Sequence, residues 1–241
     1  MSGSLYVSAA GAESRLKQLD VVSNNIANSG TTGFRASELA FEAVFEAALF
    51  DQGETPSFGR TFVGGTQAAL RGDGGPVRST GRSLDVAIQG DGFFVVEAPA
   101  GPRFTRAGAF QVDPDGFLVS NSGHLVLGEG GPISAGPRPI HIEADGAVRD
   151  DAGDLIGRLR MDRFNDASAL VREGSSLFRA PVGNEGEPVD TPVLVPRSLE
   201  GSNVQMVQEL ARLVVIQRAF DASMRSLQAE DAASSRLIQE I

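Results

Sequence analysis

The chain has 241 residues, a net charge of −10 and a single lysine, which argues against a nucleic-acid partner because phosphates would require a basic surface. It has no cysteine, which excludes disulfides and thiolate metal sites, and no apolar run approaches the roughly 20 residues needed to cross a bilayer. The 29 glycines and 12 prolines indicate many turns, which suits short strands better than long core helices.

The first predicted element is a helix from about Ser4 to Asn28, in an N-terminal segment of residues 1–30. Its apolar residues recur at intervals of three and four and share one face, as in a coiled-coil seam: Leu5, Ala9, Ala12, Leu16, Leu19 and Ile26. Poor helix formers and Gly30 predict where this helix ends. Because no core lies nearby in sequence, we expect the helix to need a partner.

Residues 31–74 are predicted to connect this helix to the middle of the chain. Phe41, Val44 and Phe45 recur at helical spacing. They follow Ser37, which can cap a helix, and so favour a short helix from Ser37 to Phe50. The next stretch is rich in Gly, Ser and Thr, which is typical of an extended connection.

The middle of the chain, residues 75–181, is predicted to be an all-β domain built from hairpins. Short apolar runs alternate with turn sequences roughly every eight to twelve residues. The turn sequences are Gly90-Asp91-Gly92, Asp113-Pro114-Asp115-Gly116, Asn121-Ser122-Gly123 and Asp145-Gly146. This pattern favours a sandwich- or barrel-like domain.

After a return connector at residues 182–200, the last predicted element is a long helix within residues 201–241. Ser202 or Asn203 can cap it, and no Gly or Pro follows. Its seam residues are Met206, Leu210, Leu213, Phe220, Met224, Leu227 and Ile238. The fold expected is therefore α+β, with long N- and C-terminal helices paired as a coiled coil and an all-β middle.

The apolar surface of the C-terminal helix is wider than a two-stranded seam requires. Val207, Val214 and Val215 extend it beyond the seam. Pairing with the N-terminal helix would bury only one face of each helix. We therefore expect the surplus surface to contact neighbouring subunits.

No catalytic, cofactor-binding or metal site is predicted. Residues 113–116 open like a calcium loop, but the twelfth position is His124 in place of Glu, so a hairpin turn is favoured. Residues 90–92 lack the third Gly and the helix of a dinucleotide-binding loop. His124 and His141 are not expected to act as catalytic bases, because no serine stands in a nucleophile-elbow sequence. An enzyme such as a cell-wall hydrolase is therefore the least favoured class.

Amide side chains on the terminal helices have two interpretations. Asn24, Asn25 and Asn28 either end the first helix or bond to a partner helix and set its register. Gln217 and Asp231 interrupt the C-terminal seam and are either solvated or serve the same purpose.

Several segments resemble one known family. Residues 27–35, Ala-Asn-Ser-Gly-Thr-Thr-Gly-Phe-Arg, closely resemble the signature that closes the first helix of bacterial flagellar rod and hook proteins. Residues 79–94 and 104–116 are similar to the family's central block, and residues 200–220 contain two parts of its closing segment. The resemblance covers nearly the whole chain in order.

Within the family, the chain looks most like the proximal-rod subunit of the flagellar basal body. Asn165-Asp166 stands where the distal-rod subunit usually has an Asn-Pro pair. Pro181-Val182-Gly183-Asn184 stands in place of that subunit's Thr-x-Ala-Ser-Gly-like stretch. A distal-rod or hook subunit is the alternative within the family, and a soluble β-domain module that binds a ligand or peptidoglycan is the alternative outside it.

The resemblance implies a structural subunit with no enzymatic activity and no cofactor, in the periplasm-spanning rod of the basal body. It implies that the terminal helices pair around a central export channel, with the β domain outside, and that the rod transmits torque from motor to hook. The implied partners are other rod and hook-family subunits, the export apparatus, and ring or bushing proteins, with no nucleic acid and no membrane insertion. Export is expected through the flagellar type III apparatus, without a cleaved signal peptide.

The residues predicted to form the assembly interface lie on the two terminal helices. Polar substitution there is expected to prevent assembly and leave the β middle folded. The predicted interface residues are Leu16, Leu19, Asn25, Ile26, Asn28, Leu210, Leu213, Phe220, Met224 and Leu227.

Overall fold

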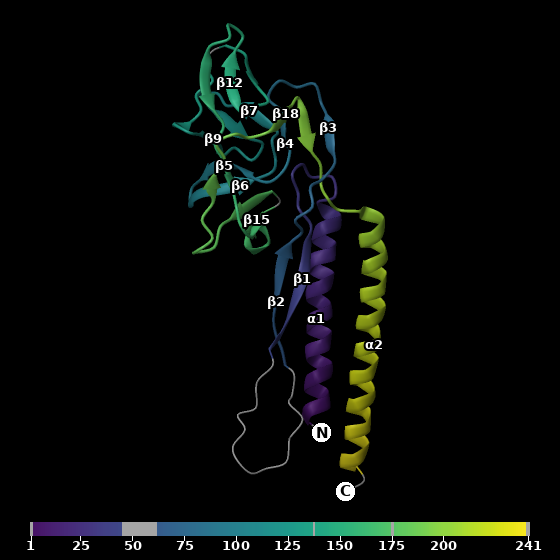
Figure 1. Ribbon diagram of the computed structural model, residues 1–241. Coiled ribbons are helices and arrows are strands. Elements are labelled where there is room, and N and C mark those ends of the chain that lie inside the picture. Colours follow the sequence, from purple (N-terminus) through teal and green to yellow (C-terminus); the bar gives the residue numbers. More distant parts are fainter. Residues whose placement is uncertain (1, 45–61, 137, 175, 240–241) are drawn as a thin grey trace. The chain divides into compact units, whose positions relative to one another are not determined.

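The computed structural model describes residues 2–44, 62–136, 138–174 and 176–239 (Figure 1). Strands fill the middle of the chain between two helices, with one short 3-10 turn, η1. In chain order the elements are α1 (Ser2–Ala27), β1 (Ser37–Val44), β2 (Phe62–Leu70), β3 (Val77–Ser79), β4 (Val86–Ile88), β5 (Phe93–Ala98), β6 (Gly101–Thr105), β7 (Phe110–Val112), β8 (Leu118–Ser120), β9 (Leu125–Gly128), β10 (Gly131–Pro132), β11 (Ile140–Ile142), β12 (Ala147–Asp150), β13 (Leu155–Arg158), β14 (Met161–Arg163), η1 (Ala167–Ala169), β15 (Val171–Glu173), β16 (Leu177–Arg179), β17 (Glu187–Pro188), β18 (Leu194–Pro196), β19 (Ser198–Glu200) and α2 (Met206–Gln239).

The chain divides into two compact units. The first, here the helical unit, comprises Met1–Asn24, Ser37–Ala69 and Val207–Ile241. The second, here the β unit, comprises Asn25–Ala36 and Leu70–Met206. The helical unit therefore contains most of α1 and α2 and the strands β1 and β2, and the β unit contains the last turn of α1 and β3 to β19.

Both predicted terminal helices are present, but their pairing as a coiled coil is wrong. Leu16 is 48% exposed, Leu210 46% and Met224 38%, whereas seam residues of a coiled coil insert between side chains of the facing helix. The buried side chains among the described parts of these helices within the unit are Ala12, Val22 and Glu209. Apolar spacing identifies a helix because it follows from helical geometry, but it does not specify what covers the apolar face.

Ser37–Val44 is strand β1, so the short helix predicted there is wrong. This strand pairs with β2 in a two-stranded sheet. The ladder satisfies backbone groups that a helix would have paired internally, so a partner distant in sequence overrides the local spacing. Residues 45–50, the rest of the predicted helix, lie outside the described residues.

The hairpin-rich β middle is confirmed. Its largest sheet has ten strands, with the order β15-β16-β6-β5-β9-β8-β7 along its main path. The β5–β6 hairpin is typical: Phe94 lies opposite Thr105, and Ala98 opposite Gly101. Strand β19 pairs with β3 and β18 pairs with β4, so the predicted return connector supplies strands to the β unit.

Strand β5 is buried on both faces, which explains its uninterrupted apolar run. Phe94 and Val96 belong to one core cluster, and Phe93 and Val95 belong to the other, as the two-residue period of a strand requires. Aromatic rings meet edge-to-face on each side of the strand. The centroids of Phe94 and Phe110 are 5.2 Å apart, and those of Phe93 and Phe164 are 5.7 Å apart.

Candidate functional site

The residues that follow α1 form the most elaborate polar site of the β unit. Local hydrogen bonds end the helix. The amide of Asn28 donates to the carbonyl of Asn25 at 3.2 Å, and the hydroxyl of Ser29 donates to the carbonyl of Ile26 at 2.9 Å. The hydroxyl of Thr31 then donates to Oδ1 of Asn28 at 3.1 Å. These bonds satisfy carbonyls and side chains at the helix end and turn the chain towards Gly33.

Gly33 lies at a position that no other residue fits. Its φ is +68°, and a Cβ built on it would lie 2.3 Å from the backbone nitrogen of Ala107. Its amide donates to the carbonyl of Glu200, at the end of β19, at 2.8 Å. A glycine therefore lets the signature segment contact two other parts of the β unit directly.

A buried carboxylate joins two buried guanidinium groups beside this contact. Glu200 lies 2.9 Å from Nη2 of Arg35 and 3.3 Å from Nη1 of Arg106, and all three side chains are at most 5% exposed. The amide of Gly75 also donates to Glu200, at 3.1 Å. Segments that are 165 positions apart in sequence, from 35 to 200, are thus held by charge-assisted hydrogen bonds.

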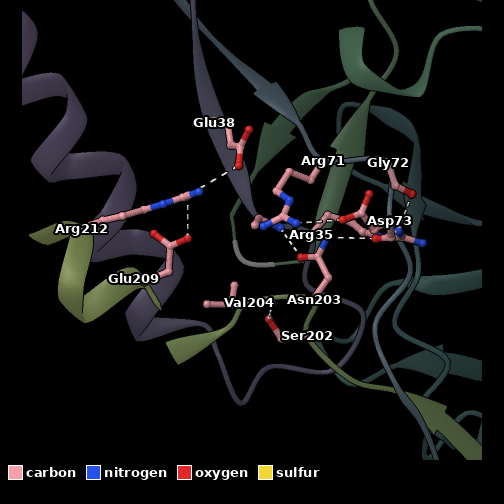
Figure 2. A network of polar contacts seen from close by, with 11 residues as sticks. Arg35, Glu38, Arg71, Gly72, Asp73, Ser202, Asn203, Val204, Glu209 and Arg212 are labelled. Carbon is pink, nitrogen blue, oxygen red and sulfur yellow. Dashed lines mark hydrogen bonds and ion pairs between the residues drawn. The ribbon is translucent and has the colours of Figure 1, made fainter. Parts of the chain in front are cut away.

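Arg35 also donates to the backbone of the segment that follows β2 (Figure 2). Its Nη1 atom donates to the carbonyls of Gly72, at 2.8 Å, and Asp73. Asn203 makes a similar connection, since its Oδ1 accepts the amide of Ala36 at 2.6 Å and its Nδ2 donates to the carbonyl of Asp73 at 2.9 Å. Asn203 therefore holds the signature segment in place and does not cap α2, which begins at Met206.

A third arginine covers the aromatic side of the site. The guanidinium of Arg172 lies 4.2 Å from the ring centroid of Phe34 and 5.4 Å from that of Phe178, and it donates to the carbonyl of Arg35. Burial lowers the pKa of Arg172 to about 10, and burial is also the main reason that the pKa of Arg106 falls to about 10. For Arg106, Glu200 opposes this shift by stabilising the charged form.

A smaller polar cluster lies in the helical unit. Nη1 of Arg212 on α2 lies 3.1 Å from Oε1 of Glu209, one turn earlier, and 3.5 Å from Oε1 of Glu38 on β1 (Figure 2). Glu209 is 2% exposed, whereas Glu38 and Arg212 are about half-exposed. The cluster connects the first turns of α2 to β1.

The predicted assembly residues fall into separate environments. Asn25 is 1% exposed within the β unit, where Ile26 and Asn28 are half-buried. In the helical unit Leu19, Leu213 and Phe220 are half-buried, and Leu16, Leu210 and Met224 are exposed. The side chain of Leu227 lies outside the described residues.

Sequence reasoning missed the buried ionic group of Arg35, Arg106 and Glu200. A usable signal was present, because each of these charged residues stands directly between two uncharged residues. Spacing could not pair them, since the three come from separate segments. Among the described residues, no group of three or more His, Asp or Glu side chains is placed to hold a metal ion. No described helix is long and apolar enough to span a membrane.

Three family descriptions match the chain. "Flagella basal body rod protein" matches residues 5–35, "Flagellar hook protein FlgE/F/G D1 domain" matches residues 87–150, and "Flagellar basal body rod FlgEFG protein C-terminal" matches residues 195–240. Together they define the class as flagellar hook and basal-body rod proteins.

Relatives that match over nearly their whole length narrow this class to the basal-body rod proteins. The flagellar basal-body rod protein FlgF of Caulobacter vibrioides is 37% identical over 227 residues, covering 92% of this chain and 91% of the relative. FlgF of Mesorhizobium japonicum is 35% identical over 98% of this chain and 95% of the relative. FlgG of Buchnera aphidicola subsp. Acyrthosiphon pisum is 31% identical over 99% and 100%, respectively. The chain belongs to the flagellar basal-body rod protein family.

Proposed function

We propose that this rod protein is a subunit of the proximal rod, and that it assembles helically with other rod and hook-family subunits through α1 and α2. The assembled rod would transmit torque from the motor to the hook, without enzymatic activity of its own. We include the flagellar export apparatus and the ring or bushing proteins among its partners.

The apolar surface that α2 leaves in solvent carries this proposal. Val207 is 81% exposed, Val215 66%, Leu210 46% and Val214 45%. Burying one such side chain recovers roughly 1.5–3 kcal/mol, so covering several of them in an assembly would be strongly favourable. Exposed apolar residues gathered on one element mark an interaction surface.

The decisive experiment places a charge on α2. We expect Phe220→Asp to prevent rod formation and motility, because a carboxylate in an apolar interface removes the burial energy and adds a desolvation cost. Rods would be counted in purified basal bodies by electron microscopy, and swimming measured in soft agar. Ser226→Asp is the matched control, since it adds the same charge at an exposed position of the same helix.

The fold of each variant would be checked by thermal unfolding of the purified chain. We expect Phe220→Asp to keep the cooperative transition of the β unit, because Phe220 belongs to the helical unit. Cells with Phe220→Asp that swim normally and have intact rods would refute the role of α2.

The position within the rod needs a separate measurement. Asn165-Asp166 and the segment 181–184 support the proximal assignment, because they depart from the distal-rod pattern. An epitope tag at the turn around Gly183 should be detected near the motor end of isolated basal bodies. Labelling next to the hook would refute the proximal assignment and leave the family membership intact.

A further inference from the structure

The β unit contains a small cavity whose wall is rich in arginine. Its volume is about 60 Å³, and four arginines line it: Arg35, Arg71, Arg106 and Arg163. One water molecule needs roughly 10–15 Å³ of such space, so the cavity has room for a group of several atoms. The one acidic residue in its lining is the exposed Asp91.

The buried part of this wall carries more positive than negative charge. Arg35 and Arg106 share one carboxylate, Glu200, and all three side chains are almost fully buried. Two largely exposed carboxylates lie near the other two arginines: Asp73, 2.8 Å from Arg71, and Glu187, 3.6 Å from Arg163. Water therefore screens those outer pairs. The two buried guanidinium groups share one buried carboxylate, and the exposed Asp91 is the other negative charge that acts on Arg106.

Two of the arginines that line the cavity each have a buried hydrogen-bond donor without an acceptor in the described part of the chain. The Nε atoms of Arg35 and Arg106 are both buried, and neither has a hydrogen-bond partner among the described residues. A buried donor left unsatisfied costs free energy, and a guanidinium is the donor best matched to a carboxylate. Leu70, Phe93, Phe164 and Ala167 form the apolar part of the lining, which would exclude water from a bound group.

We propose that this cavity binds one carboxylate group on the guanidinium groups of Arg35 and Arg106, with Arg163 at the rim attracting the anion. The carboxylate comes either from a free organic acid or from an Asp or Glu side chain of a neighbouring subunit. The proposal does not rest on the proposed assembly, because the site lies entirely within the β unit of one chain.

The test is a titration of the full chain with sodium acetate at constant ionic strength, with chloride as the balancing anion. In protein labelled with ¹⁵N-arginine, the Nε–Hε signals of Arg35 and Arg106 should shift and saturate with acetate. Shifts that stay linear, or that chloride reproduces, would overturn the site.

A matched pair of arginine variants makes this test specific. Arg163→Gln should weaken acetate binding by about twofold to fivefold, the effect expected for one partly screened charge. Arg82→Gln should leave acetate binding unchanged, because Arg82 is not in the cavity wall. The two arginines are otherwise similar: the side chain of Arg82 is 62% exposed and that of Arg163 is 58% exposed, and each lies 3.6 Å from a carboxylate. Equal effects of the two variants would refute the site. Both residues are exposed enough for the fold to survive, and the amide spectrum would confirm this.

Assembly assays then separate the two sources of the carboxylate. If a neighbouring subunit supplies it, acetate at a saturating concentration should slow rod assembly, and Arg163→Gln should do the same. If a free acid is the ligand, acetate would bind without changing assembly. Both outcomes retain the site. A failure of acetate to bind would leave the proposed rod function standing.

Discussion

Single glycine residues determine how closely segments of the β unit pack against one another. Gly33, Gly75 and Gly108 each approach another backbone so closely that a Cβ would overlap it, at 2.3, 1.9 and 1.8 Å from the nearest atom. Real Cβ atoms do not come so near to other atoms, so these contacts require glycine. Within the signature Thr-Gly-Phe-Arg, Gly33 therefore permits a close backbone contact and Arg35 supplies a buried charge.

Gly33→Ala should destabilise the β unit well beyond the usual cost of a left-handed residue. The φ of +68° alone costs about 1–2 kcal/mol for alanine, and the overlap with Ala107 adds to it. We expect a total loss of at least about 3 kcal/mol in the free energy of unfolding, measured with urea.

Gly123→Ala is the control for this substitution. Gly123 has a φ of +80°, but a Cβ there would meet nothing within 4 Å, so it should lose only about 1–2 kcal/mol. Equal losses for the two variants would show that the close approach at Gly33 has no energetic role.

At the scale of elements, turn chemistry determines where the hairpins of the β unit reverse. Between β7 and β8 the amide of Phe117 donates to Oδ1 of Asp113 at 2.8 Å, and Gly116 adopts a φ of +85°. The backbones of Asp113 and Phe117 also pair, at 2.9 Å. The sequence Asp-Pro-Asp-Gly is thus a hairpin turn, as its residue types predict.

The two aspartates of this turn offer an internal comparison. Asp113→Ala should lower the free energy of unfolding by about 1 kcal/mol, because the amide of Phe117 loses its acceptor. Asp115→Ala should change it little, since the side chain of Asp115 is exposed to solvent. Thermal unfolding of both variants measures the difference, and a larger loss for Asp115→Ala would contradict this account of the turn.

For the whole molecule, the stability should depend on pH in the acid range. Hydrogen bonds lower the pKa of three carboxyl groups below the ordinary value. Arg138 is the main cause for Asp150, Arg103 for Glu173, and the hydroxyl of Ser168 for Asp166. Groups with a lowered folded-state pKa stabilise the protein at pH values above their unfolded pKa.

Stability should therefore be retained at neutral pH and lost as the pH falls below about 4, where these carboxylates take up protons. The measurement is urea unfolding at several pH values between 7 and 3. Asp150→Asn should flatten the acid limb of this profile, because the folded state then has one fewer carboxylate with a lowered pKa.

Asp151→Asn is the control for the acid limb, since Asp151 is the exposed neighbour of Asp150. It should leave the pH profile unchanged. An identical flattening by both substitutions would mean that net charge, and not the hydrogen bonds of Asp150, sets the pH dependence.

Much of the chain's organisation follows from residues that are close together in sequence. The apolar spacing located both terminal helices, and the turn sequences located hairpins such as β7–β8, because helical periodicity and turn chemistry are local properties. The resemblance of residues 27–35 led to the family, which the relatives confirm. Local pattern failed at Ser37–Val44, where pairing with β2 made a strand of a predicted helix.

Which surfaces are covered and which charges meet depends on contacts between segments that are distant in sequence. The α2 seam has the right spacing for a coiled coil, yet Leu210 and Met224 remain exposed, because burial depends on a partner surface. Arg35, Arg106 and Glu200 share one buried site although 165 positions separate the first from the last. The positions of the helices and turns could be read from the residue pattern alone, since they depend on neighbouring residues. The fold decided the buried ionic site and the cavity beside it, since contacts between distant segments have no sequence period.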